Sequence, residues 1–282
     1  NLWTESRLAG NDDLDQLVYL SRIMGADSKL VLWGGGNTSI KTELRDYRNR
    51  PTNAMYIKGS GSDMKDSQRK HFPAVDLSGL LPIFEMEEMD DEEMVKSVAV
   101  TMLDGTAPRP SIETLLHAFL PYKCVAHSHG DAILSLTNNV KYHEILSEVY
   151  GSEVAVIPYR RPGFKLAKEV AIAAEKSPSA IGVVLMNHGL VTWGETAREA
   201  YDGHINLISK AERFIGMHHH RNRRVYGPII TQPIDNKRTR QGIAQQLAPT
   251  LRGLVSRYSS MLLRFDDSKE VLDFIGSKKA EL

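Results

Sequence analysis

The chain has 282 residues, enough to bury a large core as one sizeable domain or as a domain with a smaller appendage. Lysine plus arginine equals aspartate plus glutamate, at 35 each, so no net field favours nucleic acid or an anionic membrane. No apolar run approaches bilayer length, and the N-terminus is polar where a signal peptide is apolar. We therefore expect a cytoplasmic protein that acts on a small molecule, with no nucleic-acid or membrane partner.

The first third of the chain carries one predicted helix and two glycine-rich loops. Apolar residues at helical spacing predict an amphipathic helix over residues 12–25. Residues 30–33 and 55–58 are typical of strands, and each run leads into a loop rich in glycine and hydroxyl groups. Such loops expose backbone N–H groups that can cradle a phosphate, although neither matches a nucleotide-binding fingerprint. Taken singly, each loop is better explained as an ordinary hairpin or bulge turn.

The middle of the chain places two histidines on one side of a predicted strand. Residues 123–130 are typical of a short buried strand that ends in a glycine turn. Because strand side chains alternate, His127 and His129 point to the same side and Cys124 points to the other. Cys124 is the only cysteine, which excludes an internal disulfide and favours a reducing compartment. Two imidazoles make an incomplete metal site, because a catalytic divalent ion usually has three protein ligands.

Two further segments can complete that site. Residues 182–189 form a second apolar run, which ends in His188 and a glycine and is typical of a strand whose end lines a cavity. Glu113 lies at the start of a predicted helix. Three histidines and one carboxylate make a candidate zinc site whose carboxylate can also transfer protons. The acidic run at residues 85–93 is interpreted instead as the solvated start of a helix.

The remaining segments predict an α/β fold with an appendage. Strands and helices interleave, but some strands follow each other through tight turns, which favours a mixed or mostly antiparallel sheet flanked by helices. We expect residues 1–225 to form the main domain and residues 226–282 a linker and an appended subdomain too short to be an enzyme by itself. The appendage has a predicted helix, strand and helix at residues 241–251, 259–265 and 268–275.

Five motifs follow one another along about residues 10 to 220: Gly36-Asn37-Thr38-Ser39, Lys58-Gly59-Ser60-Gly61, Ser111-Ile112-Glu113, His127-Ser128-His129-Gly130 and Asn187-His188-Gly189. Their order resembles the class II aldolase and adducin family. Within that family the chain is most similar to the aldolase half of bifunctional rhamnulose-1-phosphate aldolase/short-chain dehydrogenase proteins, through its long loop at residues 58–63 and its tail at 252–268. No dinucleotide-binding glycine pattern follows a strand, so a dehydrogenase half is not expected in this chain.

The resemblance implies a three-layer α/β/α sandwich with a central, mainly antiparallel sheet. It also implies a homotetramer with active sites at subunit interfaces. By position in the motifs, the implied zinc (or other divalent metal) ligands are His127, His129 and His188. Glu113 is the implied proton-transfer residue, able to ligate the metal in the empty enzyme. The residues implied to hold the substrate phosphate are Asn37, Ser60, Gly61 and Ser111.

The implied reaction is cleavage of a ketose 1-phosphate, of the rhamnulose or fuculose type. It yields dihydroxyacetone phosphate and an aldehyde through a metal-stabilised enediolate. Relatives also use a tyrosine from a neighbouring subunit as a base, and the candidates here are Tyr142, Tyr150 and Tyr159. Ile112 stands where sugar-phosphate aldolases often carry a second serine. The sugar, the metal used in the cell and any dehydrogenase partner are left open.

Four other functions remain as alternatives. A pentulose-phosphate 4-epimerase shares the zinc ligands but tends to have aspartate in place of Glu113, so glutamate favours an aldolase or a keto-sugar-phosphate dehydratase. A non-catalytic adducin-like module has lost its metal ligands, whereas all three histidines are present here. A metallohydrolase leaves the two glycine loops unexplained.

Overall fold

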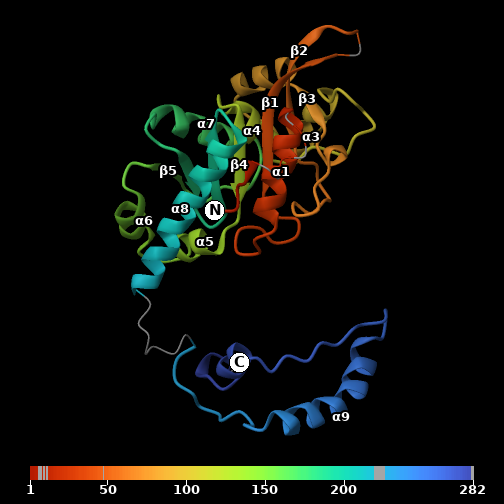
Figure 1. The fold of residues 1–282 in the computed structure, drawn as a ribbon, viewed down its shortest axis with the longest axis vertical. Helices are drawn as coiled ribbons and strands as arrows, with labels where there is room; N and C mark the ends of the chain where they lie inside the picture. Colours follow the sequence, from red (N-terminus) through yellow and green to blue (C-terminus); the bar gives the residue numbers. More distant parts are fainter. Residues whose placement is uncertain (6–7, 9, 11, 47, 219–225, 281–282) are drawn as a thin grey trace. The chain divides into compact units, whose positions relative to one another are not determined.

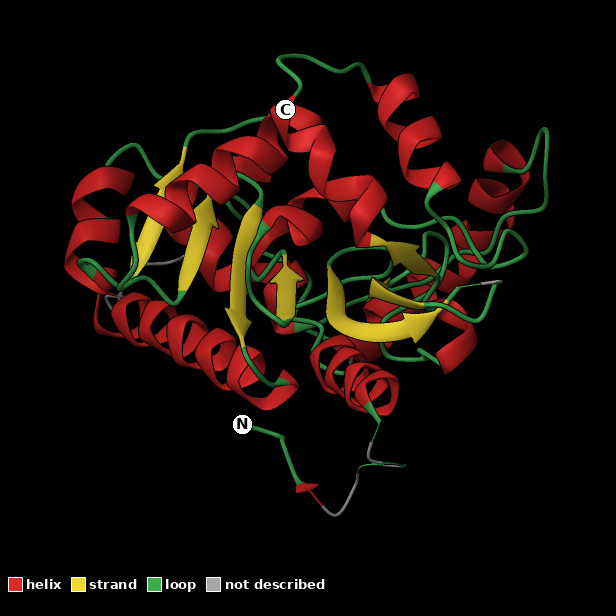
Figure 2. Ribbon diagram, turned by 90° about the horizontal axis from the view of Figure 1, so that it is seen from above, coloured by secondary structure: helices red, strands yellow, loops and turns green. Residues whose placement is uncertain are grey.

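Among the residues that the structure describes, seven short strands pair into one sheet, in the order β3-β2-β1-β4-β7-β6-β5. The strands are drawn in yellow in Figure 2. Every neighbouring pair is antiparallel except β5 and β6, which are parallel. The expected central, mainly antiparallel sheet is therefore confirmed. The strands are β1 (Asn37–Arg45), β2 (Pro51–Ile57), β3 (Ala74–Asp76), β4 (Cys124–Ser128), β5 (Val154–Ile157), β6 (Gly182–Leu185) and β7 (Gly189–Gly194).

Two layers of helices cover the two faces of the sheet. Alternating side chains divide the core, so that Val125 and Val191 pack on one side while Ala126 and Leu190 pack on the other. The layer that packs with Ala126 consists of α1 (Asp13–Gly25), α5 (Asp131–Thr137), α6 (Tyr142–Tyr150) and α8 (Ala197–His218). The opposite layer consists of α2 (Leu77–Leu80), α3 (Asp91–Val100), α4 (Thr114–Phe119) and α7 (Phe164–Lys176). The predicted three-layer sandwich is confirmed.

The segment between α1 and β1 differs from the sequence-based expectation. Leu30 and Trp33 lie in turns, residues 31–32 have no regular secondary structure, and the first strand begins only at Asn37. The backbone N–H groups of Leu30 and Val31 donate to the carbonyl of Asp27, so they are used in a turn that follows α1 and not in a strand ladder. Trp33 is 75% exposed, so burial of its side chain does not stabilise a strand at this position. The first glycine loop therefore precedes its strand.

The computed structural model describes residues 1–5, 8, 10, 12–46, 48–218 and 226–280, in two compact units (Figure 1). The units are Asn1–Gly216, which holds the sheet, and Met217–Leu282. Residues 219–225, next to the sequence-based domain boundary, lie outside the described residues, and that boundary stays a prediction. No helix in the described ranges is long and apolar enough to cross a membrane.

The C-terminal unit contains α9 (Lys237–Val255) and α10 (Lys269–Ile275), and neither helix buries a residue. An ion pair of 3.0 Å joins Arg240 to Asp267. The strand expected at residues 259–265 does not form. Leu262 is 95% exposed there, and a strand needs both a partner ladder and a covered face to be stable.

Candidate functional site

Two of the predicted metal ligands come from the end of β4. His127 is fully buried in the strand, opposite Asn37 of β1 and Val191 of β7. His129 follows the last residue of the strand, and its Nε2 lies 3.0 Å from Nε2 of His127. The alternation of strand side chains thus puts both rings on the same face of the sheet, as predicted.

The third histidine comes from the turn between β6 and β7. Leu185 pairs with Gly189, so three residues connect the strands, and Asn187 among them has φ 56°. Asparagine tolerates this left-handed conformation better than most residues. Gly189 is needed because a Cβ there would lie 2.2 Å from the carbonyl oxygen of Ser128. This close approach brings His188 to the end of β4.

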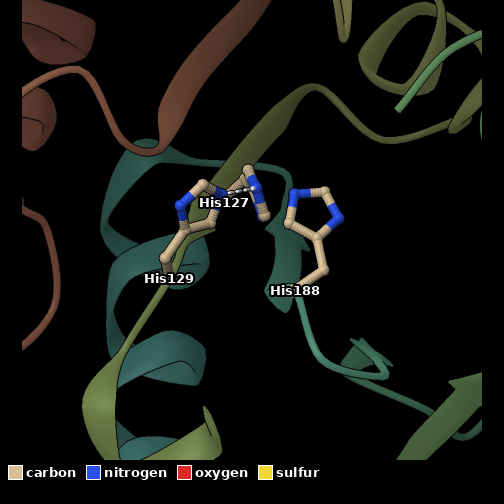
Figure 3. Close-up of side chains that lie close together, drawn as sticks. All are labelled: His127, His129 and His188. Carbon is tan, nitrogen blue, oxygen red and sulfur yellow. Dashed lines mark hydrogen bonds between the residues drawn. The ribbon is translucent and has the colours of Figure 1, made fainter. Parts of the chain in front are cut away.

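The three rings converge on one point (Figure 3). One ligand nitrogen from each of His127, His129 and His188 lies within 4.8 Å of the others. His127 Nδ1 lies 3.0 Å from the carbonyl oxygen of Leu190. A carbonyl only accepts, so Nδ1 carries the proton and the lone pair is on Nε2, which faces the other rings. The hydrogen bond thus sets the tautomer that a metal ligand needs.

Glu113 is the residue that precedes the first turn of α4, and its carboxylate faces the histidines. Its Oε1 lies 3.3 Å from His188 Nε2 and its Oε2 lies 3.5 Å from His127 Nε2. Among the described residues, Oε1 of Glu113 and Nδ1 of His188 are the buried side-chain polar atoms that lack a hydrogen-bond partner. Buried polar groups without partners are rare and call for a missing ligand.

The charge balance of this cluster fits a divalent cation. Burial lowers the pKa values of His127, His129 and His188 to about 4, so the rings are neutral near pH 7. The buried Glu113 carboxylate therefore has no countercharge in the three rings beside it. Three neutral imidazoles around one point, with a carboxylate at their edge, match the donor set of a catalytic zinc site. These residues fit the predicted metal.

A chain of buried hydrogen bonds holds one oxygen of Glu113. The Asn37 side-chain amide donates to Glu113 Oε2 over 2.7 Å and to Ser111 Oγ over 3.1 Å. His117 Nε2 lies 2.5 Å from Asn37 Oδ1, and its Nδ1 lies 2.8 Å from Ser39 Oγ. Since the Asn37 oxygen only accepts, His117 donates through Nε2 and fixes the orientation of the amide. Glu113 is therefore held by one oxygen and unpaired at the other.

The predicted phosphate residues lie around the same cavity as the histidines. The cavity has a volume of about 400 Å³, and Ile112 and Trp33 form part of its rim. Of the eight residues predicted for the site, seven line it, and His127 lies fully buried beside it. The seven are Asn37, Ser60, Gly61, Ser111, Glu113, His129 and His188. The structure thus brings together residues that were separated by up to 151 positions in the sequence.

Three residues around the site were not singled out by the sequence. Lys58 also lines the cavity, is 4% exposed and donates from Nζ to the Gly59 carbonyl over 3.2 Å. Its place in the Lys-Gly-Ser-Gly motif was the signal. His117 lies four residues after Glu113, and this spacing by itself indicates only a packing or supporting role. His204 offers no signal in the sequence, because a lone histidine on an amphipathic helix is most often a packing residue.

The tyrosine candidates separate by burial. Tyr150 is 2% exposed and its hydroxyl donates to the Leu207 carbonyl over 3.0 Å, so it is part of the core and cannot serve as a base for another subunit. Tyr142 packs partly against the same core, whereas Tyr159 is 58% exposed. Tyr159 therefore remains the most accessible of the three.

Comparison with known proteins identifies the family. Residues 15–214 match the family described as the class II aldolase and adducin N-terminal domain, which covers more than two thirds of the chain. The chain belongs to the class II aldolase and adducin family. The solved N-terminal class II aldolase domain of a conserved protein from Thermoplasma acidophilum has 45% sequence identity and a TM-score of 0.72, covering 76% of this chain and 98% of that one. The family expected from the five motifs is confirmed.

Two further relatives differ in what their names say. An uncharacterized oxidoreductase, YuxG of Bacillus subtilis, is 40% identical over 99% of this chain. The chain spans only 40% of the length of that relative. An L-fuculose phosphate aldolase from Methanococcus maripaludis is 26% identical over 62% of this chain and 81% of its own length. Members of the superfamily thus include an enzyme that acts on a sugar phosphate.

Proposed function

We propose that this chain is a zinc-dependent aldolase, or uses another divalent metal, and cleaves a ketose 1-phosphate of the rhamnulose or fuculose type. The observation that supports it most is the unpaired Oε1 of Glu113, buried beside three neutral histidine rings at the edge of a polar cavity. A divalent ion held by His127, His129 and His188 supplies Lewis acidity for the charge that develops when the C3–C4 bond breaks.

The glycine loops bind the substrate phosphate in this proposal. Ser60 and Ser111 offer hydroxyl groups, and Gly61 lets the backbone approach the anion closely. Lys58 adds a positive charge, and it forms no ion pair with any described carboxylate. Burial lowers the pKa of Lys58, because desolvation disfavours its charged form, and an anion in the cavity would restore the balance.

Glu113 moves the proton in the proposed reaction. Its Oε2 accepts from the Asn37 amide, which keeps the carboxylate in place. Its Oε1 is directed at the histidines and has no hydrogen-bond partner, so we assign to this oxygen the transfer of a proton to or from the carbon of dihydroxyacetone phosphate. Asn37 thus positions the glutamate, and its second contact to Ser111 joins the glutamate to the phosphate loops.

The assembly and the second base are also part of the proposal. We expect a homotetramer in which a tyrosine of a neighbouring subunit acts on the C4 hydroxyl. Tyr159 is the best candidate in this chain because its side chain is 58% exposed. This proposal concerns the present chain alone, because the chain matches only 40% of the length of the YuxG relative.

The test combines metal content with product release. Purified protein should contain near-stoichiometric zinc or another divalent metal, and it should release dihydroxyacetone phosphate from rhamnulose 1-phosphate or fuculose 1-phosphate. Chelation should abolish the release and added zinc should restore it. Bound metal without cleavage would contradict the aldolase assignment and favour an epimerase or a dehydratase. Protein that binds no metal would favour a non-catalytic module.

A further inference from the structure

Another buried histidine lies behind the metal-binding strands, on the face of the sheet opposite to the cluster. His204 of α8 is fully buried, and its Nε2 lies 2.7 Å from Ser128 Oγ of β4. Its Nδ1 lies 2.9 Å from Thr192 Oγ1 of β7. Ser128 and Thr192 are fully buried too. One ring therefore joins two neighbouring strands from behind.

The direction of each hydrogen bond follows from the partners. The Thr192 hydroxyl donates to the Ala200 carbonyl over 3.0 Å, so its oxygen accepts from His204 Nδ1. Burial lowers the pKa of His204 to about 3, so the ring is neutral and has one donor and one acceptor. Nε2 must then accept from the Ser128 hydroxyl. Each side-chain polar atom of His204, Ser128 and Thr192 therefore has a partner, and the three residues form a single defined arrangement.

One of the joined residues lies between two proposed metal ligands, and the other lies on the strand that follows the third. Ser128 is flanked by His127 and His129, and it is the last residue of β4, so its side chain is the last internal anchor before His129. Thr192 lies on β7, which begins directly after His188. A side chain of α8 also packs closely behind the end of β4. A Cβ on Gly130 would lie only 2.8 Å from Ile208 Cδ1.

We propose that His204 is a positioning residue of the metal centre, which holds β4, the strand that carries His127 and leads into His129, at a set distance from β7, the strand that follows His188. The inference rests on the proposed metal site. His204 touches neither metal nor substrate, and it acts through Ser128. Partners that orient metal ligands typically change metal affinity by about 10 to 100-fold when removed.

Two substitutions at His204 separate its two hydrogen bonds. In His204→Gln the side-chain oxygen can reach the position of Nε2 and accept from Ser128. In His204→Asn the amide nitrogen can reach the position of Nδ1 and donate to Thr192, but nothing accepts from Ser128. We expect His204→Asn and Ser128→Ala to weaken zinc binding by about 10 to 100-fold. His204→Gln should remain within a few-fold of the wild type.

Zinc affinity is measured by competition with a chromophoric chelator, and ligand geometry by the visible spectrum of the Co²⁺-substituted protein. The spectrum should change in His204→Asn and Ser128→Ala and stay near that of the wild type in His204→Gln. The double variant Ser128→Ala/His204→Asn should bind zinc no worse than either single variant, because both remove the same contact.

Tyr150→Phe is the matched control. It also removes a buried hydrogen bond to α8, the one to Leu207, but Tyr150 contacts no ligand-bearing strand through that bond. Unfolding of the metal-free protein in chelator should show that this variant is less stable than the wild type. Its zinc affinity, measured by competition, should be unchanged.

Two results would overturn the inference. Folded His204→Asn and Ser128→Ala that bind zinc like the wild type would reduce His204 to core packing, and so would His204→Gln that loses as much affinity as His204→Asn. In both cases the proposed function would survive, since the wild type still binds zinc. Wild-type protein that binds no zinc would overturn the metal site and this inference together.

Discussion

The histidine cluster and the glycine-loop pocket form two halves of one cavity, but they are built differently. The histidines come from a strand, its end and a three-residue turn, and the buried bonds of His127 and Glu113 fix their orientation. The pocket is made of loops, and its rim includes Trp33 at 75% exposed and Ile112 at 46% exposed. The space beside Gly61 is open, since a Cβ on this residue would meet no atom within 4 Å.

This difference separates chemistry from recognition. Groups that move electrons and protons need positions held within fractions of an ångström, which strands and buried hydrogen bonds provide. Loops on a rigid framework can change without disturbing the core, so they suit the choice of substrate. We therefore expect changes in the cluster to abolish metal binding or turnover, and changes in the pocket to alter substrate affinity alone.

The largest effect should come from the cluster itself. His129→Ala removes one of three proposed metal ligands, and the remaining two make an incomplete site. Bound metal, measured by elemental analysis, and activity should be lost together. The exposed His143 provides a control, and His143→Ala should keep both. Full metal content in His129→Ala would break the distinction between the two halves of the cavity.

The second-largest effect is expected from the loss of the proton-transfer group. Glu113→Gln keeps the size of the side chain but cannot take up a proton, so turnover should fall by about 10² to 10⁴-fold while metal content is retained. Steady-state kinetics together with metal analysis measures this. Glu93→Gln, at an exposed acid of α3, is the matched control. Normal turnover in Glu113→Gln would show that another group moves the proton.

A smaller effect is expected in the pocket. Lys58→Met removes the charge that is proposed to face the phosphate, and charged hydrogen bonds contribute about 1.5 to 3 kcal/mol. KM for the sugar phosphate should therefore rise by about 10 to 100-fold, with kcat and metal content little changed. The same variant should show no difference with a substrate that lacks the phosphate. A fall in kcat at unchanged KM would place Lys58 in the chemical step and not in recognition.

The pH dependence of stability tests the buried histidines. Burial lowers the pKa of His127 to about 4 and that of His204 to about 3, from an ordinary 6.5. Below pH 6.5 the unfolded chain binds protons that the folded chain does not, so the free energy of unfolding decreases as pH falls toward 4.

Each such histidine adds a slope of about 1.4 kcal/mol per pH unit. Urea unfolding of chelated protein near neutral pH and near pH 5 measures it. In His204→Gln the slope of the free energy of unfolding with pH should decrease by up to the contribution of one proton, about 1.4 kcal/mol per pH unit. A pH-independent stability would mean that these rings become protonated in the folded state as readily as in water.

The smallest effect concerns Ile112. This residue lies on the rim of the cavity and is 46% exposed, so a change there costs little core packing. Ile112→Ser adds a hydroxyl beside Ser111, and one neutral hydrogen bond contributes about 0.5 to 1.5 kcal/mol. KM should fall by about 2 to 10-fold without a change in kcat. Ile112→Ala serves as the control, because it removes the isoleucine without adding a donor.

Local patterns in the sequence were sufficient for much of this site. The alternation of strand side chains puts His127 and His129 on one face, and this depends only on the two-residue period of a strand. The order of the five motifs pointed to the family and, through it, to the three-layer sandwich. The segment at residues 30–33 shows the limit, since an apolar run can become a strand or a turn depending on where its N–H groups find acceptors.

The sequence by itself determined which side chains have the chemistry for a metal site, because residue type and strand alternation are local properties. Only the tertiary structure decided that His188 and Glu113 meet His127. It also decided that His117 orients Asn37, which holds the glutamate, and that His204 joins the strands from behind. These contacts join residues far apart in the chain. Their distances depend on how sheet and helices pack around a shared core, which no local pattern encodes.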